Sequence, residues 1–201
     1  GPFSPLSPMS KITRSGPHAI KQEQRELHKK VRVLLNDVLP LDDCCKITDD
    51  DIIMRHLIAK QWKEKDAVAS VREYAKWRGV GKVNQVASLP YTLKVKDQLH
   101  GYFGRDREGF PVYFDQPNPS ALTKLAKEEK REDIINWHLV VAEMGRRLAK
   151  EGKVDRITCV LDLRHVGMSI IGNPRAMSLL KECASIDQHK YPENMRVMCI
   201  I

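Results

Sequence analysis

The sequence lacks any uninterrupted apolar run of about 18 residues, so no membrane-spanning helix is expected. Cysteine is scarce as well, with five in the chain, and none has the spacing of zinc ligands. Cys44 and Cys45 are adjacent, whereas Cys159, Cys183 and Cys199 lie in apolar stretches where cysteine behaves as a small hydrophobic residue. We therefore expect no metal ion, and a reducing, cytoplasmic compartment.

The common catalytic motifs are absent too. Gly79-Val80-Gly81 is not a dinucleotide-binding fingerprint, because Asn84 stands where the third glycine belongs. No cysteine is followed six residues later by the arginine that a phosphatase loop requires. The sequence also contains neither a Gly-x-Ser-x-Gly nucleophile elbow nor a His-Glu-x-x-His pair. We therefore predict that the chain is not an enzyme, with no catalytic residue and no cofactor.

Positive charge, by contrast, is in excess. Lysine and arginine outnumber aspartate and glutamate by 34 to 26, which gives a formal net charge of +8. Such a balance favours contact with an anionic surface, either a membrane or a nucleic acid. No basic stretch is interleaved with aromatic residues, which make up only 6% of the chain. Nucleic acid is therefore the less favoured partner.

Helices are predicted in the first part of the chain. Residues 1–17 are rich in proline, serine and glycine, so we expect a flexible segment there. A first helix is expected over about 19–38 and a third over about 64–78. Thr48 suits the N-cap of a second helix, because three aspartates follow it and carboxylates stabilise the positive end of the helix dipole. Its expected apolar face comprises Ile53, Met54, Leu57 and Ile58. Residues 18–80 are thus predicted to form an N-terminal helical cap.

The pattern changes in the second part of the chain. Leu99–Phe103 and Pro111–Asp115 flank a turn-like segment and are predicted to form a β-hairpin. Asn118-Pro119 has the form of a helix start. A long helix is expected over about 128–150, with a core-facing stripe that requires no cofactor contact. This stripe comprises Ile134, Trp137, Val141, Met144 and Leu148.

Two apolar runs near the end of the chain are predicted to be strands. Ile157–Leu163 and Val197–Ile201 are typical of strands buried on both faces of a parallel sheet. Asn173-Pro174 begins a helix between them, with Ala176, Leu179, Leu180 and Cys183 on one face. A strand, a helix and a strand in this order form a parallel, right-handed βαβ unit. We therefore predict an α/β fold in which a helical cap precedes a mainly parallel sheet flanked by helices.

The sequence stops directly after the second apolar run, at Ile201. Domains usually finish with a polar segment at the surface, so we expect that the C-terminal part of this domain is missing. The sheet is then expected to have an unpaired edge that a partner chain covers.

Four segments carry a resemblance to a known family. They are Asp51–Trp62 continuing to Trp77-Arg78, His100–Phe114, Cys159–Leu163 followed by Gly167-Met168-Ser169, and Tyr191-Pro192-Glu193. In this order and spacing they resemble the CRAL-TRIO family of lipid-binding and lipid-transfer domains, over residues 48–201. Residues 81–201 are then expected to form the first part of the lipid-binding domain, which ends before the helix that gates the pocket in this family.

The resemblance implies a non-catalytic pocket for one phospholipid or other hydrophobic ligand, and an association with the membrane periphery. Glu193 matches the glutamate that helps to hold an inositol headgroup in the phosphatidylinositol-transfer branch. A carboxylate suits that ring because it accepts hydrogen bonds from two hydroxyls. Lys60 stands where the same branch carries a basic residue near the lipid phosphate. The alternatives are a loop carboxylate and a solvated lysine, neither with a ligand.

Tyr102 and Tyr113 match two tyrosines that surround a choline headgroup in the same branch. Aromatic faces attract a quaternary ammonium group, although an aromatic residue is also good strand material. Ile157 and Cys159 stand where the resemblance expects small hydroxyl residues of the choline site, so choline binding is not favoured. A second hypothesis is a degenerate domain of this family that acts as a protein-interaction or scaffold module.

Overall fold

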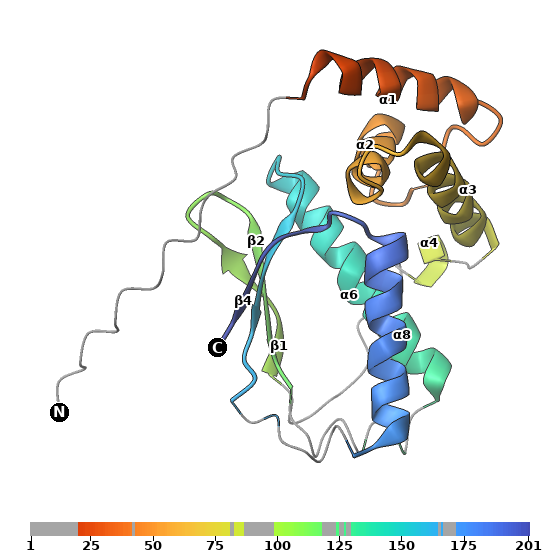
Figure 1. The fold of residues 1–201 in the computed structure, drawn as a ribbon. Helices are drawn as coiled ribbons and strands as arrows, with labels where there is room; N and C mark the ends of the chain where they lie inside the picture. The colour runs from red at the N-terminus through yellow and green to blue at the C-terminus, as the bar shows by residue number, and fades with distance from the viewer. Residues whose placement is uncertain are drawn as a thin grey trace.

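Among the described residues, the first elements along the chain are helices, and from Leu99 onward strands alternate with helices, as the change of pattern predicts (Figure 1). The computed structural model describes residues 20–41, 43–80, 83–86, 99–117, 124, 127, 130–164, 166 and 172–201. The predicted flexible segment 1–17, the predicted helix start at Asn118-Pro119 and the turn of Gly167-Met168-Ser169 lie outside these residues.

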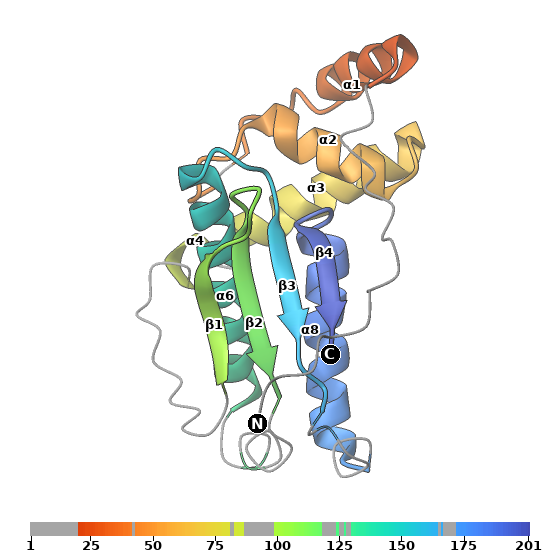
Figure 2. The same ribbon diagram turned by 90° about the vertical axis from the view of Figure 1, so that its left-hand side faces the viewer.

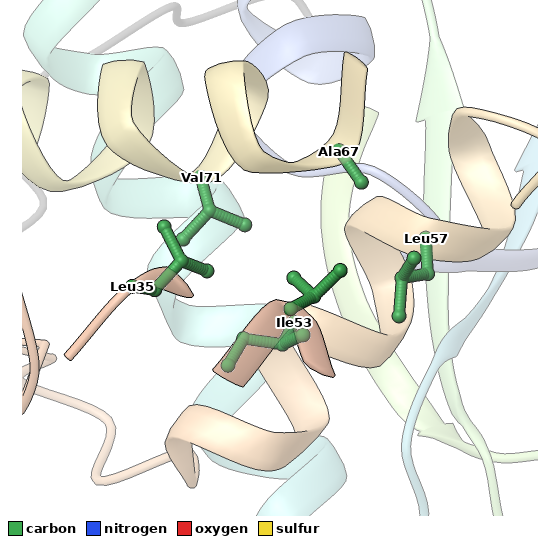
Figure 3. Close-up of a cluster of buried hydrophobic side chains, with 6 residues drawn as sticks. Leu35, Ile53, Leu57, Ala67 and Val71 are labelled. Carbon is green, nitrogen blue, oxygen red and sulfur yellow. The ribbon is translucent and has the colours of Figure 1, made fainter. Parts of the chain in front are cut away.

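Three helices of the first part pack around one hydrophobic cluster (Figure 3). They are α1 (Gln22–Leu34), α2 (Asp49–Ala59) and α3 (Glu64–Val80). The cluster comprises buried aliphatic side chains from these helices and from the residue after α1: Val31, Leu35, Ile53, Leu57, Ala67 and Val71. The predicted helical cap is therefore present, although α1 is shorter than the predicted 19–38 because residues 35–38 form a turn.

Thr48 caps α2 as the sequence predicts. Its Oγ1 accepts a hydrogen bond of 3.2 Å from the N–H of Asp51, which satisfies one of the donors left free at a helix start. The predicted apolar face is shifted, because Ile58 is 41% exposed whereas His56 is buried. This shift turns a titratable side chain into the interior.

The strands form one sheet in the order β1-β2-β3-β4 (Figure 2). They are β1 (Leu99–Arg105), β2 (Pro111–Gln116), β3 (Ile157–Leu161) and β4 (Met195–Ile200). β1 and β2 are antiparallel, while β2, β3 and β4 run parallel to one another. The predicted hairpin, the parallel pairing of the last two strands and the α/β fold class are thus confirmed.

Two long helices, α6 (Arg131–Glu151) and α8 (Pro174–Lys190), cover one face of the sheet (Figure 2). A short helix, α4 (Val83–Val86), lies beside α3 and α6. Asn173 caps α8 as predicted, since its Oδ1 accepts the N–H groups of Arg175 and Ala176, both at 3.1 Å. The helix between β3 and β4 therefore starts where the Asn-Pro pair indicates.

The predicted burial of the terminal strand is wrong. Met198 and Ile200 are 47% and 61% exposed, respectively. Among the described strands β4 is the last in the sheet and pairs with β3 alone, so its free edge has no neighbouring strand to cover it. An apolar run predicts a strand here but does not reveal that the strand lies at an edge.

The predicted stripe of α6 is buried only in part. Ile134 and Val141 are buried, whereas Trp137, Met144 and Leu148 are half-buried. The Trp137 indole lies edge-on to the His100 ring, with centroids 5.0 Å apart. On α8, Ala176 and Leu179 are buried, but Leu180 is 43% exposed, so that predicted face is narrower than expected. None of the described helices is both long and apolar enough to span a lipid bilayer.

Candidate functional site

A small pocket lies between the helical cap and the C-terminal end of α8. Its walls come from α2, α3, α6 and the turn between α8 and β4. The lining residues are Ile52, Arg55, His56, Tyr74, Arg146, Lys190, Tyr191, Pro192 and Asn194. Three of these side chains, Arg55, Arg146 and Lys190, are cationic. A concave site lined by cations concentrates a positive potential and therefore favours an anionic group.

Arg55 joins the two walls of this pocket. Its guanidinium group donates a hydrogen bond of 3.4 Å to Oδ1 of Asn194 and another to the backbone oxygen of Asp155. Burial lowers the pKa of Arg55, but an arginine stays charged at any ordinary pH. The α2 helix is thus fastened through one cation to the turn that precedes β4.

His56 contributes no positive charge to the pocket at neutral pH. Its side chain is 1% exposed, and Nδ1 lies 2.9 Å from Oγ of Ser70. Burial lowers the pKa of His56 to about 4, and the neighbouring charge of Lys60 lowers it further in the same direction. The available cations of the pocket are therefore Arg55 and Lys190, because Arg146 is held by the ion pairs described next.

A buried ionic cluster, formed by Asp43, Arg78, Glu143 and Arg146, adjoins the pocket, and its Arg146 also lines the pocket. Glu143 of α6, fully buried, pairs with Arg146 at 2.9 Å and with Arg78 of α3. Arg146 also pairs with Oδ2 of Asp43, and the same oxygen accepts a hydrogen bond of 3.0 Å from the Tyr74 hydroxyl. Burial alone would raise the pKa of Glu143, but the Arg146 and Arg78 guanidinium groups outweigh it and hold that pKa below its usual value.

Sequence reasoning missed this cluster. The signal was present in α6, where Glu143 and Arg146 interrupt a run of buried residues that includes Leu139, Val141 and Ala149. Two opposite charges three residues apart within an apolar helix face indicate a paired, buried site rather than a solvated one. Arg78, which pairs with Glu143, is 65 residues away from it in the chain, and no local sequence pattern predicts that the two residues pair.

The Tyr191–Asn194 turn rests on this ionic cluster. Tyr191 is 5% exposed, its hydroxyl donates a hydrogen bond of 2.8 Å to Oε1 of Glu143, and its ring meets that of Trp77 edge-on at 5.7 Å. Glu193 has a φ of 55°, in the left-handed region, and its side chain is half-buried. A residue other than glycine in this conformation is uncommon, and such positions cluster at functional sites.

Lys60 and Glu193 lie on the two elements that meet at the pocket, but neither lines it. Lys60 follows the last residue of α2, where its N–H donates to the backbone oxygen of His56 at 2.9 Å, and its side chain is half-buried. Glu193 lies between two lining residues, Pro192 and Asn194. That the two side chains share one cavity mouth therefore stays a prediction.

Tyr102 and Tyr113 are brought together. They are paired in the register of β1 and β2, and their ring centroids lie 5.2 Å apart. The Tyr102 hydroxyl donates a hydrogen bond of 3.2 Å to the backbone oxygen of Val141 on α6. Gly145 makes this approach feasible, since a Cβ built there would lie 2.1 Å from that hydroxyl oxygen. The pair thus lies between the sheet and α6, beside the buried Cys159 that is aligned with Tyr113 in β3.

Comparison with known proteins finds relatives, two of which are described here. Phosphatidylinositol/phosphatidylcholine transfer protein SFH11 of Arabidopsis thaliana is 26% identical over 164 residues, which cover 76% of this chain and 43% of that protein. SEC14 cytosolic factor of Eremothecium gossypii is 26% identical over 181 residues, covering 84% and 58%, respectively. This chain therefore spans only part of the length of these relatives.

A solved structure shares the fold. The crystal structure of Sfh5 superposes with a TM-score of 0.65 at 13% identity, covering 88% of this chain and 69% of that one. The sequence model of the CRAL/TRIO domain matches residues 96–201, which is more than half of the chain and includes the whole sheet. The chain belongs to the CRAL/TRIO domain family.

Proposed function

We propose that this protein binds a membrane phospholipid, or a related hydrophobic ligand, and exchanges it at a membrane surface without catalysis. The family and the names of its relatives support a lipid ligand. Within that class we favour an inositol phospholipid, whose headgroup combines hydroxyls with phosphate. Lys60 is assigned to the phosphate and Glu193 to the ring hydroxyls, with Tyr102 and Tyr113 as further lipid-contacting residues.

The observation that carries this proposal is the meeting of α2 with the Tyr191–Asn194 turn. The two elements are joined by Arg55 and Asn194, and their junction is lined by cations. An inositol phosphate requires a cation for its phosphate and an acceptor for its hydroxyls, and neither group does the work of the other. Lys60 directly follows α2 and Glu193 lies within the turn, and we assign the cation to the first and the acceptor to the second.

A choline headgroup fits less well. Tyr102 already donates its hydroxyl to α6, so it is held against that helix. Ile157 and Cys159 are both buried, and an isoleucine offers the choline phosphate no hydrogen bond. The tyrosine pair is therefore proposed to contact the lipid as an apolar wall, in which only the ring faces are used.

The net charge of +8 supports exchange at an anionic membrane. We propose a cytoplasmic protein that associates peripherally with such membranes. Screening by salt weakens attraction between exposed charges, so transfer to anionic vesicles is expected to slow as the ionic strength rises.

The proposal is tested by phosphatidylinositol transfer between vesicles. Glu193→Ala and Lys60→Ala each remove one charge-assisted contact, worth about 1.5–3 kcal/mol, and are expected to weaken phosphatidylinositol binding about 10- to 150-fold. Binding of an uncharged hydrophobic ligand is expected to remain. Lys65→Ala and Glu151→Ala, which change exposed residues of the same charge elsewhere, are the matched controls.

Unchanged phosphatidylinositol transfer by Glu193→Ala would contradict the inositol assignment. A hydrophobic ligand of another kind would then remain the proposed cargo. Loss of transfer in the two control variants as well would point to a general effect of charge, and would also count against these two residues.

An interaction module is the second candidate function. It is favoured by the exposed apolar side chains of β4, among them Met198 (47% exposed) and Ile200 (61% exposed). A partner chain that adds a strand beside β4 would cover such an edge. If the purified protein carries no lipid and forms a stable complex through β4, this second function replaces lipid transfer.

A further inference from the structure

Three metal-ligating atoms meet at the rim of the ionic cluster. Sγ of Cys44 and Sγ of Cys45 lie 3.9 Å apart, and Oε2 of Glu143 lies 3.6 Å from the first and 2.9 Å from the second. Cys45 is 4% exposed and Glu143 fully buried, whereas Cys44 is partly exposed. Both thiols direct their S–H groups toward the same carboxylate oxygen.

These separations are close to those around a single zinc ion. Zn–S bonds of about 2.3 Å and a Zn–O bond of about 2.1 Å, at tetrahedral angles, place two sulfurs about 3.8 Å apart and sulfur and oxygen about 3.6 Å apart. The distance between the sulfurs and the distance from Cys44 to the carboxylate match these values. The distance from Cys45 to the carboxylate is shorter, because a hydrogen bond now joins these atoms.

The charges around this point balance, with the Arg78 guanidinium 3.9 Å from Sγ of Cys44 and that of Arg146 2.9 Å from Oε2 of Glu143. Asp43 and Glu143 carry two negative charges, and Arg78 and Arg146 carry two positive charges, so the ionic cluster is neutral as a whole. A divalent ion that displaces the two thiol protons leaves this sum unchanged.

We propose that Cys44, Cys45 and Glu143 bind one divalent thiophilic cation of the zinc class, with a solvent molecule as fourth ligand on the exposed side of Cys44. Two S–H bonds break, two metal–sulfur bonds and one metal–oxygen bond form, and both protons pass to solvent. Thiolate ligands favour zinc over magnesium or calcium, which prefer oxygen. The cation ties the segment before α2 to α6 and thereby secures the helical cap on the rest of the protein. Adjacent cysteines lack the usual spacing of zinc ligands, so the sequence alone predicts no such site.

The test is a zinc titration of the full chain under a reducing agent that does not bind metal. We expect one zinc ion per chain by native mass spectrometry, a dissociation constant of about 1 µM or tighter from competition with a chromophoric chelator, and release of two protons per ion. Cys44→Ser is expected to weaken binding at least 100-fold. Cys183→Ser, which changes a half-buried cysteine of α8, is the matched control and is expected to bind zinc as the parent does.

Folding of the variants is checked separately. Cys44 is partly exposed, so Cys44→Ser is expected to keep the far-ultraviolet circular dichroism of the parent, and it decides the test even if Cys45→Ser does not fold. Cadmium adds a second readout, since cadmium–thiolate bonds absorb in the ultraviolet in the parent and not in Cys44→Ser. Absence of a one-to-one zinc complex, unchanged zinc affinity in Cys44→Ser, or equal loss in Cys183→Ser overturns the proposal.

Discussion

The Tyr191 hydroxyl lies 2.8 Å from Oε1 of Glu143 and donates a hydrogen bond to it. Tyr191 begins the turn that carries Glu193, and Glu143 lies on α6 and pairs with Arg78 of α3. One hydrogen bond thus connects the proposed headgroup site to a sheet-covering helix and to the helical cap. The position of Glu193 depends on a buried charge that is distant from it in the sequence.

Removing the Tyr191 hydroxyl is expected to destabilise the protein. A hydrogen bond to a charged acceptor contributes about 1.5–3 kcal/mol, so Tyr191→Phe should lower the free energy of unfolding by about that amount. Tyr102→Phe is the matched control, because its hydroxyl donates to a neutral carbonyl and should cost only about 0.5–1.5 kcal/mol. Urea denaturation of both variants measures the difference, and equal losses would contradict the special role of Tyr191.

Glu143→Ala is expected to cost about 3–5 kcal/mol, because it leaves two buried guanidinium groups to share the single carboxylate of Asp43. Asp37→Ala breaks the exposed pair with Arg72 and should leave the stability nearly unchanged, since exposed ion pairs contribute little. Chemical denaturation provides both values. A loss in Glu143→Ala no larger than that in Asp37→Ala would show that the buried cluster is not a structural centre.

Gly145→Ala places a methyl carbon 2.1 Å from the present position of the Tyr102 hydroxyl oxygen, so the two atoms clash. Overpacking of this kind typically costs about 1–3 kcal/mol, and it should outweigh the better helix propensity of alanine. Gly79→Ala in α3 meets nothing within 4 Å and should instead be neutral or stabilising by about 0.5–1 kcal/mol. Combining Gly145→Ala with Tyr102→Leu should recover part of the loss, and a tolerated Gly145→Ala single variant would refute the close approach.

The buried His56 is expected to make the stability of the protein depend on pH. Burial lowers its pKa from 6.5 to about 4, so the unfolded chain takes up this proton before the folded one does. The free energy of unfolding therefore falls as the pH drops from about 6.5 toward 4, by about 2 kcal/mol between pH 7 and pH 5. His56→Gln should flatten this dependence, whereas His189→Gln, at an exposed position of α8, should not. Urea denaturation at the two pH values tests it, and parallel curves for the parent and His56→Gln would contradict the burial argument.

Local signals predicted the fold well. Thr48 and Asn173 cap the helices that the sequence assigns to them, and the two apolar runs near the end of the chain are parallel neighbours joined by α8. These features depend on a few adjacent residues, and the chemistry of a cap or a β-run does not change with its surroundings. The exposure of Ile200 was not predictable in this way, because it depends on which strand lies at the edge of the sheet.

The site was predictable only in outline. The resemblance proposes Lys60 and Glu193 as site residues, and α2 and the Tyr191–Asn194 turn both contribute residues to one pocket, which neither Lys60 nor Glu193 lines. The buried ionic cluster next to that pocket was not predicted. Its residues Arg78, Glu143 and Asp43 come from three distant segments, and each looks like an ordinary surface charge in the sequence. Their burial is a consequence of pairing, and pairing between remote segments leaves no periodic pattern in a single sequence.

The roles proposed for Lys60 and Glu193 both require that this protein holds an inositol phospholipid. The most direct measurement is native mass spectrometry of the full chain after incubation with vesicles of phosphatidylinositol and phosphatidylcholine in equal amounts. We expect a one-to-one complex enriched in phosphatidylinositol, with that enrichment lost in Glu193→Ala but retained in Glu151→Ala. A protein that emerges without lipid, or one that carries the two lipids in equal amounts before and after the Glu193 change, would contradict it.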